Sequence, residues 1–259
     1  MTFADRIADA RRARHMTQTK LAELLDVSPE AVSKWERGEY APTPEKLALL
    51  YKELKLPYLA DTDAEPLYSE AHMSAFIKGR TSGRGFPETQ KALAYAKQAH
   101  EGQFRMPGDT PYINHPLTMV CHALAMGLED DVLLAALLLH DVVEDCPVRT
   151  DELPVSEEVQ RIVALVTKTG REEQAYYADI AGDLRACLVK CIDRCYNLGT
   201  MALGFSKEKI AQYVTETETY YPPLLKTLKA APQYNDASWL LDYLIRALLR
   251  TAKRISSLA

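Results

Sequence analysis

Residues Leu137 to Asp145 read LLLHDVVED, in which an apolar run ends on two side chains that can bind a metal ion. The run begins at Val132, and its composition indicates a buried helix. Neighbouring residues of a helix point about 100° apart, so His140 and Asp141 can reach one ion only at the end or the flank of that helix. An imidazole and a carboxylate together suit Mn, Fe, Zn or Ni, with open positions for water and substrate.

A histidine next to an aspartate is a weak signal alone, because a lone histidine in an apolar helix usually packs there or caps the helix. Two further candidates strengthen the signal. His115 lies in the motif YINHPL, and Asp193 is the lone acid in the apolar motif VKCIDRCYNL. Asp193 alone could instead be a buried ion-pair partner of Lys190 or Arg194. The joint occurrence of these motifs favours a metal site of two imidazoles and two carboxylates.

Two more acids follow the histidine-aspartate pair at helical spacing. Glu144 and Asp145 each lie four residues after one member of the pair, and therefore one turn further on. Acids at the mouth of a metal site can orient or deprotonate a water molecule. The alternative is a solvated helix end. By the same spacing, Asn197 lies one turn after Asp193 and can present its amide to a substrate.

The segment MTQTKLAELLDVSPEAVSKWERGEYAPT, which starts at Met16, has the pattern of two short helices joined by a tight turn. Thr17 can cap the first helix, and Ser28 can cap the second, with Pro29 at its first position. Trp35 is placed to anchor the second helix in the core of this unit. We therefore expect a helix-turn-helix.

This N-terminal segment resembles the Cro and phage-repressor (XRE) family of helix-turn-helix modules over about 55 residues. The resemblance implies that the second helix enters the major groove of DNA, where Glu30 would accept from cytosine and Lys34 would donate to guanine. Gln18 and Arg37 would lie near phosphates. The implied DNA contacts are Gln18, Ser28, Pro29, Glu30, Ser33, Lys34 and Arg37.

The charge of this segment is low for a DNA-binding protein. Residues 1–60 carry ten Lys and Arg against nine Asp and Glu, a net charge of +1, whereas affinity for DNA comes mostly from neutralised phosphates. Arg11, Arg12 and Arg14 do cluster beside the expected interface. The alternative is a helical scaffold for protein contact or dimerisation. Specific binding of a double-stranded operator would require a homodimer.

The second part of the chain, from about Glu88 to Leu225, resembles the HD hydrolase domain of the RelA/SpoT alarmone enzymes, and most closely the stand-alone small alarmone hydrolases. Those enzymes share an R…G-x-P-Y-I-x-H-P loop, an L-L-H-D-x-x-E-D helix and a K-x-x-D-R-x-x-N helix. The resemblance implies one Mn ion and a guanosine polyphosphate substrate. The implied ligands of the ion are His115, His140, Asp141 and Asp193.

The same resemblance assigns the other roles. Glu144 and Asp145 would activate the attacking water, and Arg105, Lys168 and Asn197 would contact the nucleotide. The implied reaction is hydrolysis of the 3′-pyrophosphate of (p)ppGpp to GDP or GTP and pyrophosphate. Two alternatives stay open: a related phosphatase acting on another nucleotide, such as the 2′-phosphate of NADPH, and a nucleotide-sensing transcriptional regulator without turnover. An autoregulator or an antitoxin would fit the fusion to a DNA-binding unit.

The chain departs from those enzymes at three places. The loop RMPGDTPYINH is one residue longer, which changes the reach of Arg105. The helix around Asp193 reads KCIDRCYN where KLADRLHN is usual. After Leu225 the remaining segment is too short for a synthetase domain, so we expect degradation of alarmone and not synthesis.

Helical periodicity dominates the whole chain, which predicts an all-α fold with a hairpin-like loop near residues 107–114. We expect a helix-turn-helix domain over 1–56, a linker with a short helix over 57–86, and an HD-type domain over 87–259. The net charge of −5 argues against general binding to nucleic acid or anionic membranes. No apolar run approaches the length of a membrane span or a signal peptide. Five cysteines, three of them spaced four apart on one helix, suggest reduced thiols in a cytoplasmic protein.

Overall fold

The computed structural model describes residues 3–40, 42–43, 46, 49–50, 53–54, 69–105, 110–201 and 205–257. Contacts divide the chain into two compact units, Met1–Leu67 and Tyr68–Ala259. The first part of the predicted linker, at 57–68, lies outside the described residues, as does the tip of the predicted hairpin at 106–109. No described helix has both the length and the apolar character needed to cross a membrane.

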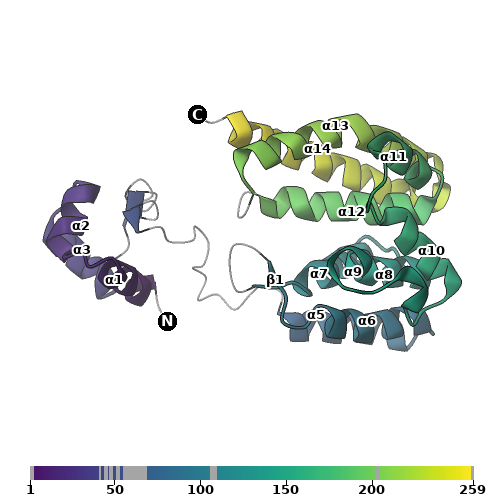
Figure 1. Ribbon diagram of the computed structural model, residues 1–259, viewed down its shortest axis with the longest axis horizontal. Helices are drawn as coiled ribbons and strands as arrows, with labels where there is room; N and C mark the ends of the chain where they lie inside the picture. Colours follow the sequence, from purple (N-terminus) through teal and green to yellow (C-terminus); the bar gives the residue numbers. More distant parts are fainter. Residues whose placement is uncertain are drawn as a thin grey trace. The chain divides into compact units, whose positions relative to one another are not determined.

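The described part of the first unit contains the expected helices, α1 (Phe3–Ala13), α2 (Gln18–Leu25) and α3 (Pro29–Glu36) (Figure 1). These helices close on a small apolar core, in which Trp35 is 4% exposed. The core consists of Ile7, Leu21, Ala22, Leu25, Val32, Trp35, Leu50 and Leu54.

Local hydrogen bonds fix where α2 and α3 begin. Thr17 Oγ1 accepts from the backbone N–H of Lys20, and Ser28 Oγ accepts from that of Ala31. These bonds satisfy N–H groups that have no partner within the helix. Asp26 ends α2 in a left-handed conformation with φ of 51°, which turns the chain sharply into α3. The predicted caps and turn are confirmed.

Among its described residues, the second unit is helical apart from a short hairpin, as predicted. In the hairpin, β1 (Phe104–Arg105) pairs antiparallel with β2 (Thr110–Pro111). The first helices are α5 (Glu70–Ser82), α6 (Pro87–Ala99), α7 (Asn114–Ala125), α8 (Asp131–Leu139), α9 (Val142–Asp145) and α10 (Glu157–Val166). The later helices are α11 (Glu173–Ala181), α12 (Leu184–Thr200), α13 (Lys207–Ala230) and α14 (Asn235–Ser257), with short 3₁₀ turns at Thr150–Glu152 and Pro232–Tyr234.

Helix α12 is the centre of this unit. It packs against α7, α8 and α10 on one side and against α13 and α14 on the other (Figure 1). Helix α8 is buried on all its faces from Leu133 to Leu139, which explains why its sequence lacks polar positions. The short helix expected within the linker is α5. It packs on α6 and α7 and so belongs to the second unit.

Candidate metal centre and substrate pocket

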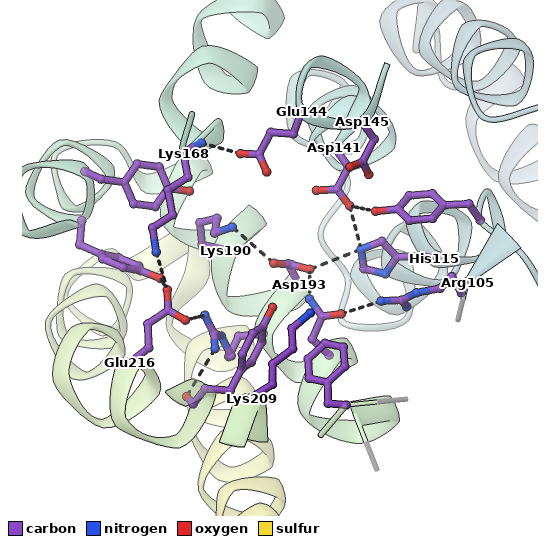
Figure 2. Close-up of a pocket in the computed structure, with 17 residues that line it drawn as sticks. Arg105, His115, Asp141, Glu144, Asp145, Lys168, Lys190, Asp193, Lys209 and Glu216 are labelled. Atoms are coloured by element: carbon purple, nitrogen blue, oxygen red, sulfur yellow. Dashed lines mark hydrogen bonds and ion pairs between the residues drawn. The ribbon is translucent and has the colours of Figure 1, made fainter. Parts of the chain in front are cut away.

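Four side chains from three parts of the second unit bring their donor atoms together. Figure 2 draws His115, Asp141 and Asp193. His115 comes from the first turn of α7, His140 and Asp141 lie where α8 gives way to α9, and Asp193 comes from the middle of α12. The distance from His140 Nε2 is 3.0 Å to Asp141 Oδ2 and 3.1 Å to His115 Nε2. His115 Nε2 lies 3.4 Å from both Asp141 Oδ2 and Asp193 Oδ1.

This cluster has the dimensions of a site for one divalent cation. Ligands about 2.1 Å from an ion lie about 3.0 to 3.4 Å apart when they are neighbours in octahedral or tetrahedral geometry. The donor atoms of His115, His140 and Asp141 all lie within 4.8 Å of one another, and Asp193 Oδ1 is 3.8 Å from His140 Nε2. His140 Nδ1 is 2.9 Å from the Leu137 carbonyl, to which it can donate. Nε2 then keeps its lone pair for a metal.

Burial and charge act in opposite directions on these groups. Burial opposes the charge of His140, but the carboxylate of Asp141 outweighs it and raises the pKa of His140 to about 9. Burial also opposes the charge of Asp193, but the ammonium of Lys190, 3.4 Å away, helps to lower its pKa below the usual range. The pKa of Asp141 is lowered well below its usual value, against burial, by the charge of His140. The cluster therefore presents two carboxylates to any bound cation.

Tyr112, which follows β2, holds Asp141 in place. Its hydroxyl donates to Asp141 Oδ2 over 2.6 Å. Burial, together with the charge of Asp141, raises the pKa of Tyr112 far above its usual value, so the hydroxyl keeps its proton. The sequence analysis did not identify Tyr112, although it lies three residues before His115 in the quoted YINHPL motif.

The two predicted water-activating acids lie at the mouth of the cluster. The α8 helix ends at Leu139, and the Asp141 carbonyl accepts from the N–H groups of Glu144 (3.1 Å) and Asp145 (2.9 Å) to start α9. Both acids are exposed and line the pocket. The Glu144 carboxylate also accepts from the backbone N–H of Lys168 over 2.5 Å, which ties the α10–α11 connection to the pocket edge.

Asn197 and Arg105 extend the cluster on its other side. Asn197 Nδ2 donates to Asp193 Oδ1 over 2.6 Å, and Arg105 Nη2 donates to Asn197 Oδ1 over 2.9 Å. The Arg105 guanidinium carbon also lies 4.9 Å from the ring centroid of Tyr196. The longer loop therefore does not keep Arg105 from the site. The Asn197 amide is engaged by these two neighbours, so it positions Asp193 as well as facing the pocket.

A pocket of about 450 Å³ opens above the cluster. Its wall is rich in charge of both signs (Figure 2), which suits a polyanion that enters together with a cation. The basic lining residues are Arg105, Lys168, Lys190, Arg194 and Lys209. The acidic lining residues are Asp141, Glu144, Asp145, Asp193 and Glu216.

Glu216, on α13, anchors one wall of this pocket and was missed by the sequence analysis. It accepts from Tyr177 Oη (2.6 Å), Arg194 Nη2 (2.9 Å) and Lys168 Nζ (3.1 Å). Burial acts to raise the pKa of Glu216. The nearby groups, of which the charge of Arg194 has the largest effect, outweigh burial and lower this pKa to about 2. Arg194 is thus the ion-pair partner of Glu216, whereas Lys190 pairs with the neighbouring Asp193.

The first unit presents one face of α3 outward. Val32 and Trp35 point into the core, and the predicted contact residues of α3 lie on the exposed or half-buried faces. Four of these side chains pair with neighbours: Lys34 Nζ with Glu30 (2.9 Å), and Arg37 with Ser33 (2.5 Å) and also with Glu39 (2.7 Å). The face comprises Pro29, Glu30, Ser33, Lys34 and Arg37, with Ser28 at the N-cap.

Glu36 ties α3 back to α1 and α2. Arg11 Nε lies 2.6 Å from Glu36 Oε1, and the Arg11 side chain is only 11% exposed. Gln18 Nε2 donates to Glu36 Oε2 over 2.8 Å. Arg11 is therefore a structural residue, which corrects its grouping with the surface arginines Arg12 and Arg14. To contact a DNA phosphate, Gln18 would have to give up its hydrogen bond to Glu36.

The matches to known families follow the same division of the chain. A helix-turn-helix family model matches residues 7–58, and an HD domain family model matches residues 92–228. The latter span contains all four residues of the candidate metal site. The chain belongs to the HD domain family. The helix-turn-helix match is of the XRE type, so both resemblances seen in the sequence are confirmed.

Curated proteins similar to the HD domain include alarmone enzymes. The chain is 33% identical over 169 residues to guanosine-3′,5′-bis(diphosphate) 3′-pyrophosphohydrolase of Aquifex aeolicus, covering 61% of this chain and 24% of that protein. It is 32% identical over 153 residues to the bifunctional (p)ppGpp synthase/hydrolase SpoT of Escherichia coli. That match covers 54% of this chain and 21% of SpoT. The match thus spans about a quarter or a fifth of the length of these relatives.

A solved structure shares the fold of the HD domain. It is that of a metazoan ortholog of SpoT that hydrolyses ppGpp, with a TM-score of 0.50 and 24% sequence identity. The alignment covers 62% of this chain and 95% of that protein, so nearly all of the other protein corresponds to part of this chain.

Proposed function

We propose that the HD domain hydrolyses the 3′-pyrophosphate of ppGpp and pppGpp, giving GDP or GTP and pyrophosphate, with one Mn²⁺ ion. The observation that carries the proposal is the meeting of His115, His140, Asp141 and Asp193 beneath a pocket lined by five basic side chains. The activities named for the relatives from A. aeolicus and E. coli support the choice of substrate.

The four clustered side chains would hold the cation through nitrogen and oxygen donors, a set that suits Mn²⁺. A divalent cation supplies a Lewis acid, which polarises phosphoryl oxygens and makes water a better nucleophile at neutral pH. In the reaction, water attacks the phosphorus joined to the ribose 3′ oxygen. The bond from that phosphorus to the 3′ oxygen breaks, and pyrophosphate leaves the ribose.

The exposed acids at the mouth would handle the protons. Glu144 and Asp145 face the pocket as carboxylates, and either can accept the proton that the attacking water loses. The ribose 3′ oxygen gains a proton as the bond breaks. Glu144 is held by the backbone of Lys168, and the Asp145 carboxylate interacts with the hydroxyl of Tyr112.

The basic side chains would hold the phosphates. Arg105 can bind a phosphate through two N–H groups at once, and its guanidinium is already oriented by Asn197 and Tyr196. Lys168 approaches the pocket from the opposite wall, where it pairs with Glu216. A substrate diphosphate between these walls would compete with the carboxylates for the same cations.

The test is product formation by the purified full chain with Mn²⁺ and a panel of ppGpp, pppGpp, NADPH and cyclic nucleotides. Asp141→Ala should abolish pyrophosphate release from the alarmones. Asp151→Ala should not, because Asp151 is an exposed acid whose ion-pair partner among the described residues is Arg149. Release of monophosphate from NADPH alone would replace this proposal with the related phosphatase. Tight alarmone binding without turnover would indicate a sensor.

We infer further that the N-terminal unit binds a double-stranded operator as a homodimer, with α3 in the major groove. The matched helix-turn-helix model and the outward face of α3 support this role. Selection from a random DNA library should yield a palindromic site. Lys34→Ala should weaken binding to that site by about tenfold or more, whereas Lys226→Ala, on α13 of the second unit, should not. If no DNA sequence is selected, with or without alarmone, the inference is refuted. A change in DNA affinity when ppGpp is added would show that the HD domain is coupled to DNA binding.

A further inference from the structure

Helix α14 exposes a row of large apolar side chains that the proposed functions do not use. Trp239 is 58% exposed, Leu240 45%, Tyr243 70% and Leu244 36%. The opposite side of the same helix, which includes Leu241, is buried against α12 and α13. Contiguous exposed apolar side chains of this size mark a contact surface on soluble proteins.

The row continues in both directions and has opposite charges at its two ends. Asp236, Leu240, Tyr243, Ala247 and Arg250 follow one another at steps of three or four residues, so they share one face of the helix. The acid lies at the N-terminal end of this face and the arginine at the C-terminal end. Neither makes an ion pair with another described residue of the chain. We call this surface the α14 face.

We propose that the α14 face binds the same face of a second copy of this chain, with the two helices antiparallel. A two-fold axis near Tyr243 would place Leu240 against the partner subunit's Ala247, where the small side chain leaves room for it. The same axis would place Asp236 beside the partner subunit's Arg250, and the reverse, as a two-fold interface requires. A parallel pairing would instead set arginine against arginine and acid against acid, which is repulsive.

The size of the surface agrees with a specific dimer. The four exposed apolar side chains offer roughly 450 Å² per copy, judged from aromatic residues that bury about 150–250 Å² each when covered completely. Two copies with their flanking Arg246, Ala247 and Arg250 side chains would bury more than about 1,000 Å² in total, which is the lower bound for a specific interface.

Trp239, the largest side chain on this surface, is already held in place. Lys229 Nζ lies 3.7 Å from the ring centroid of Trp239, and the same ammonium pairs with Asp242 at 2.5 Å. A side chain that is fixed before association loses less conformational entropy when it is covered. Trp239 is therefore suited to anchor the contact.

This dimer goes beyond the proposed hydrolysis and does not depend on it. It would supply the two-fold symmetry that a helix-turn-helix needs to read a palindrome, from a surface on the HD domain. A contact between N-terminal units would give the same stoichiometry, so the test must address the α14 face itself.

The first experiment is sedimentation velocity on the full chain across the micromolar range. The wild type should be a dimer. The double variant Leu240→Glu/Tyr243→Glu should associate about 100-fold more weakly or not at all, as expected when central contacts are lost. Lys226→Glu makes the same change in net charge at an exposed position of α13 and should leave the dimer intact. Circular dichroism and thermal melting check that each variant is folded.

The second experiment tests the antiparallel pairing by exchanging its charges. Asp236→Arg and Arg250→Asp should each weaken the dimer, and the double exchange should restore it. A monomeric wild type, or a dimer that none of these variants weakens, would overturn the proposal. A monomer that sediments with phosphatidylserine vesicles through Trp239 would also overturn it, in favour of a membrane surface.

Discussion

Removal of the Tyr112 hydroxyl tests whether the clustered side chains form a metal site. Tyr112→Phe keeps the aromatic ring, which lies 4.7 Å from the His100 ring, centroid to centroid. The change removes the 2.6 Å hydrogen bond to Asp141 and the interaction of the same hydroxyl with Asp145. A hydrogen bond to a charged group contributes about 1.5–3 kcal/mol, which corresponds to roughly 10- to 150-fold in a binding constant. Loss of a group that orients a ligand usually weakens metal affinity by about 10- to 100-fold.

Isothermal titration of the metal-free protein with Mn²⁺ measures this effect without reference to turnover. We expect the affinity of Tyr112→Phe to fall by about 10- to 100-fold, with one ion still bound per chain. Activity should recover at high Mn²⁺, because the substrate-binding residues are unchanged. Tyr40→Phe, at a 51% exposed tyrosine of the first unit, should bind as the wild type does. Unchanged affinity in a folded Tyr112→Phe protein would refute the role of Asp141 as a ligand held by Tyr112.

Three other outcomes follow from the same structure. Because the pKa of His140 is raised to about 9 without a cation, the ring must lose a proton to bind one. The Mn²⁺ affinity should then rise about tenfold per pH unit up to pH 9, and calorimetry in buffers of different ionisation heat should detect one released proton. The pKa of Glu216 is lowered to about 2 from 4.5, so its ion pairs stabilise the fold above pH 4.5, and that contribution is lost as the pH falls toward 2. Its size is at most about 3 kcal/mol, and acid unfolding of Glu216→Gln should lack this component. Trp35→Ala should destabilise the first unit by about 3–5 kcal/mol and abolish DNA binding, while Mn²⁺ titration of the same variant should be unchanged.

The features that the sequence predicted well are local ones. A cap such as Thr17 or Ser28 acts within one turn of its helix, so its effect is visible in a few residues of sequence. The apolar run before His140 is equally local, because a helix without polar positions must be buried on every side. His115 and Asp193 are far apart in the chain, and only the recurrence of known motifs indicated that they meet.

The features that were missed depend on how distant helices pack. Glu216 and Lys209 lie on α13, and nothing in their neighbourhood of the sequence shows that this helix lines the pocket. Arg11 was grouped with surface arginines, because its neighbours in sequence are basic and its partner is 25 residues away. A charged residue can lie on the surface or form a buried ion pair. The local sequence is the same in both cases, and only the tertiary contact distinguishes them.

The central position of α12 has a consequence for motion within the HD domain. Its Asp193 faces donors from α7 and from the α8–α9 junction, so a cation bound there would add a link between two groups of helices that already meet through side-chain packing and through ion pairs such as Arg185–Asp130. Removal of the ion should therefore speed amide hydrogen exchange in α12 and in the α8–α9 junction more than in α5 and α6, which lie away from it. A protein depleted of metal would then be recognised by its uneven exchange pattern before any loss of helix content.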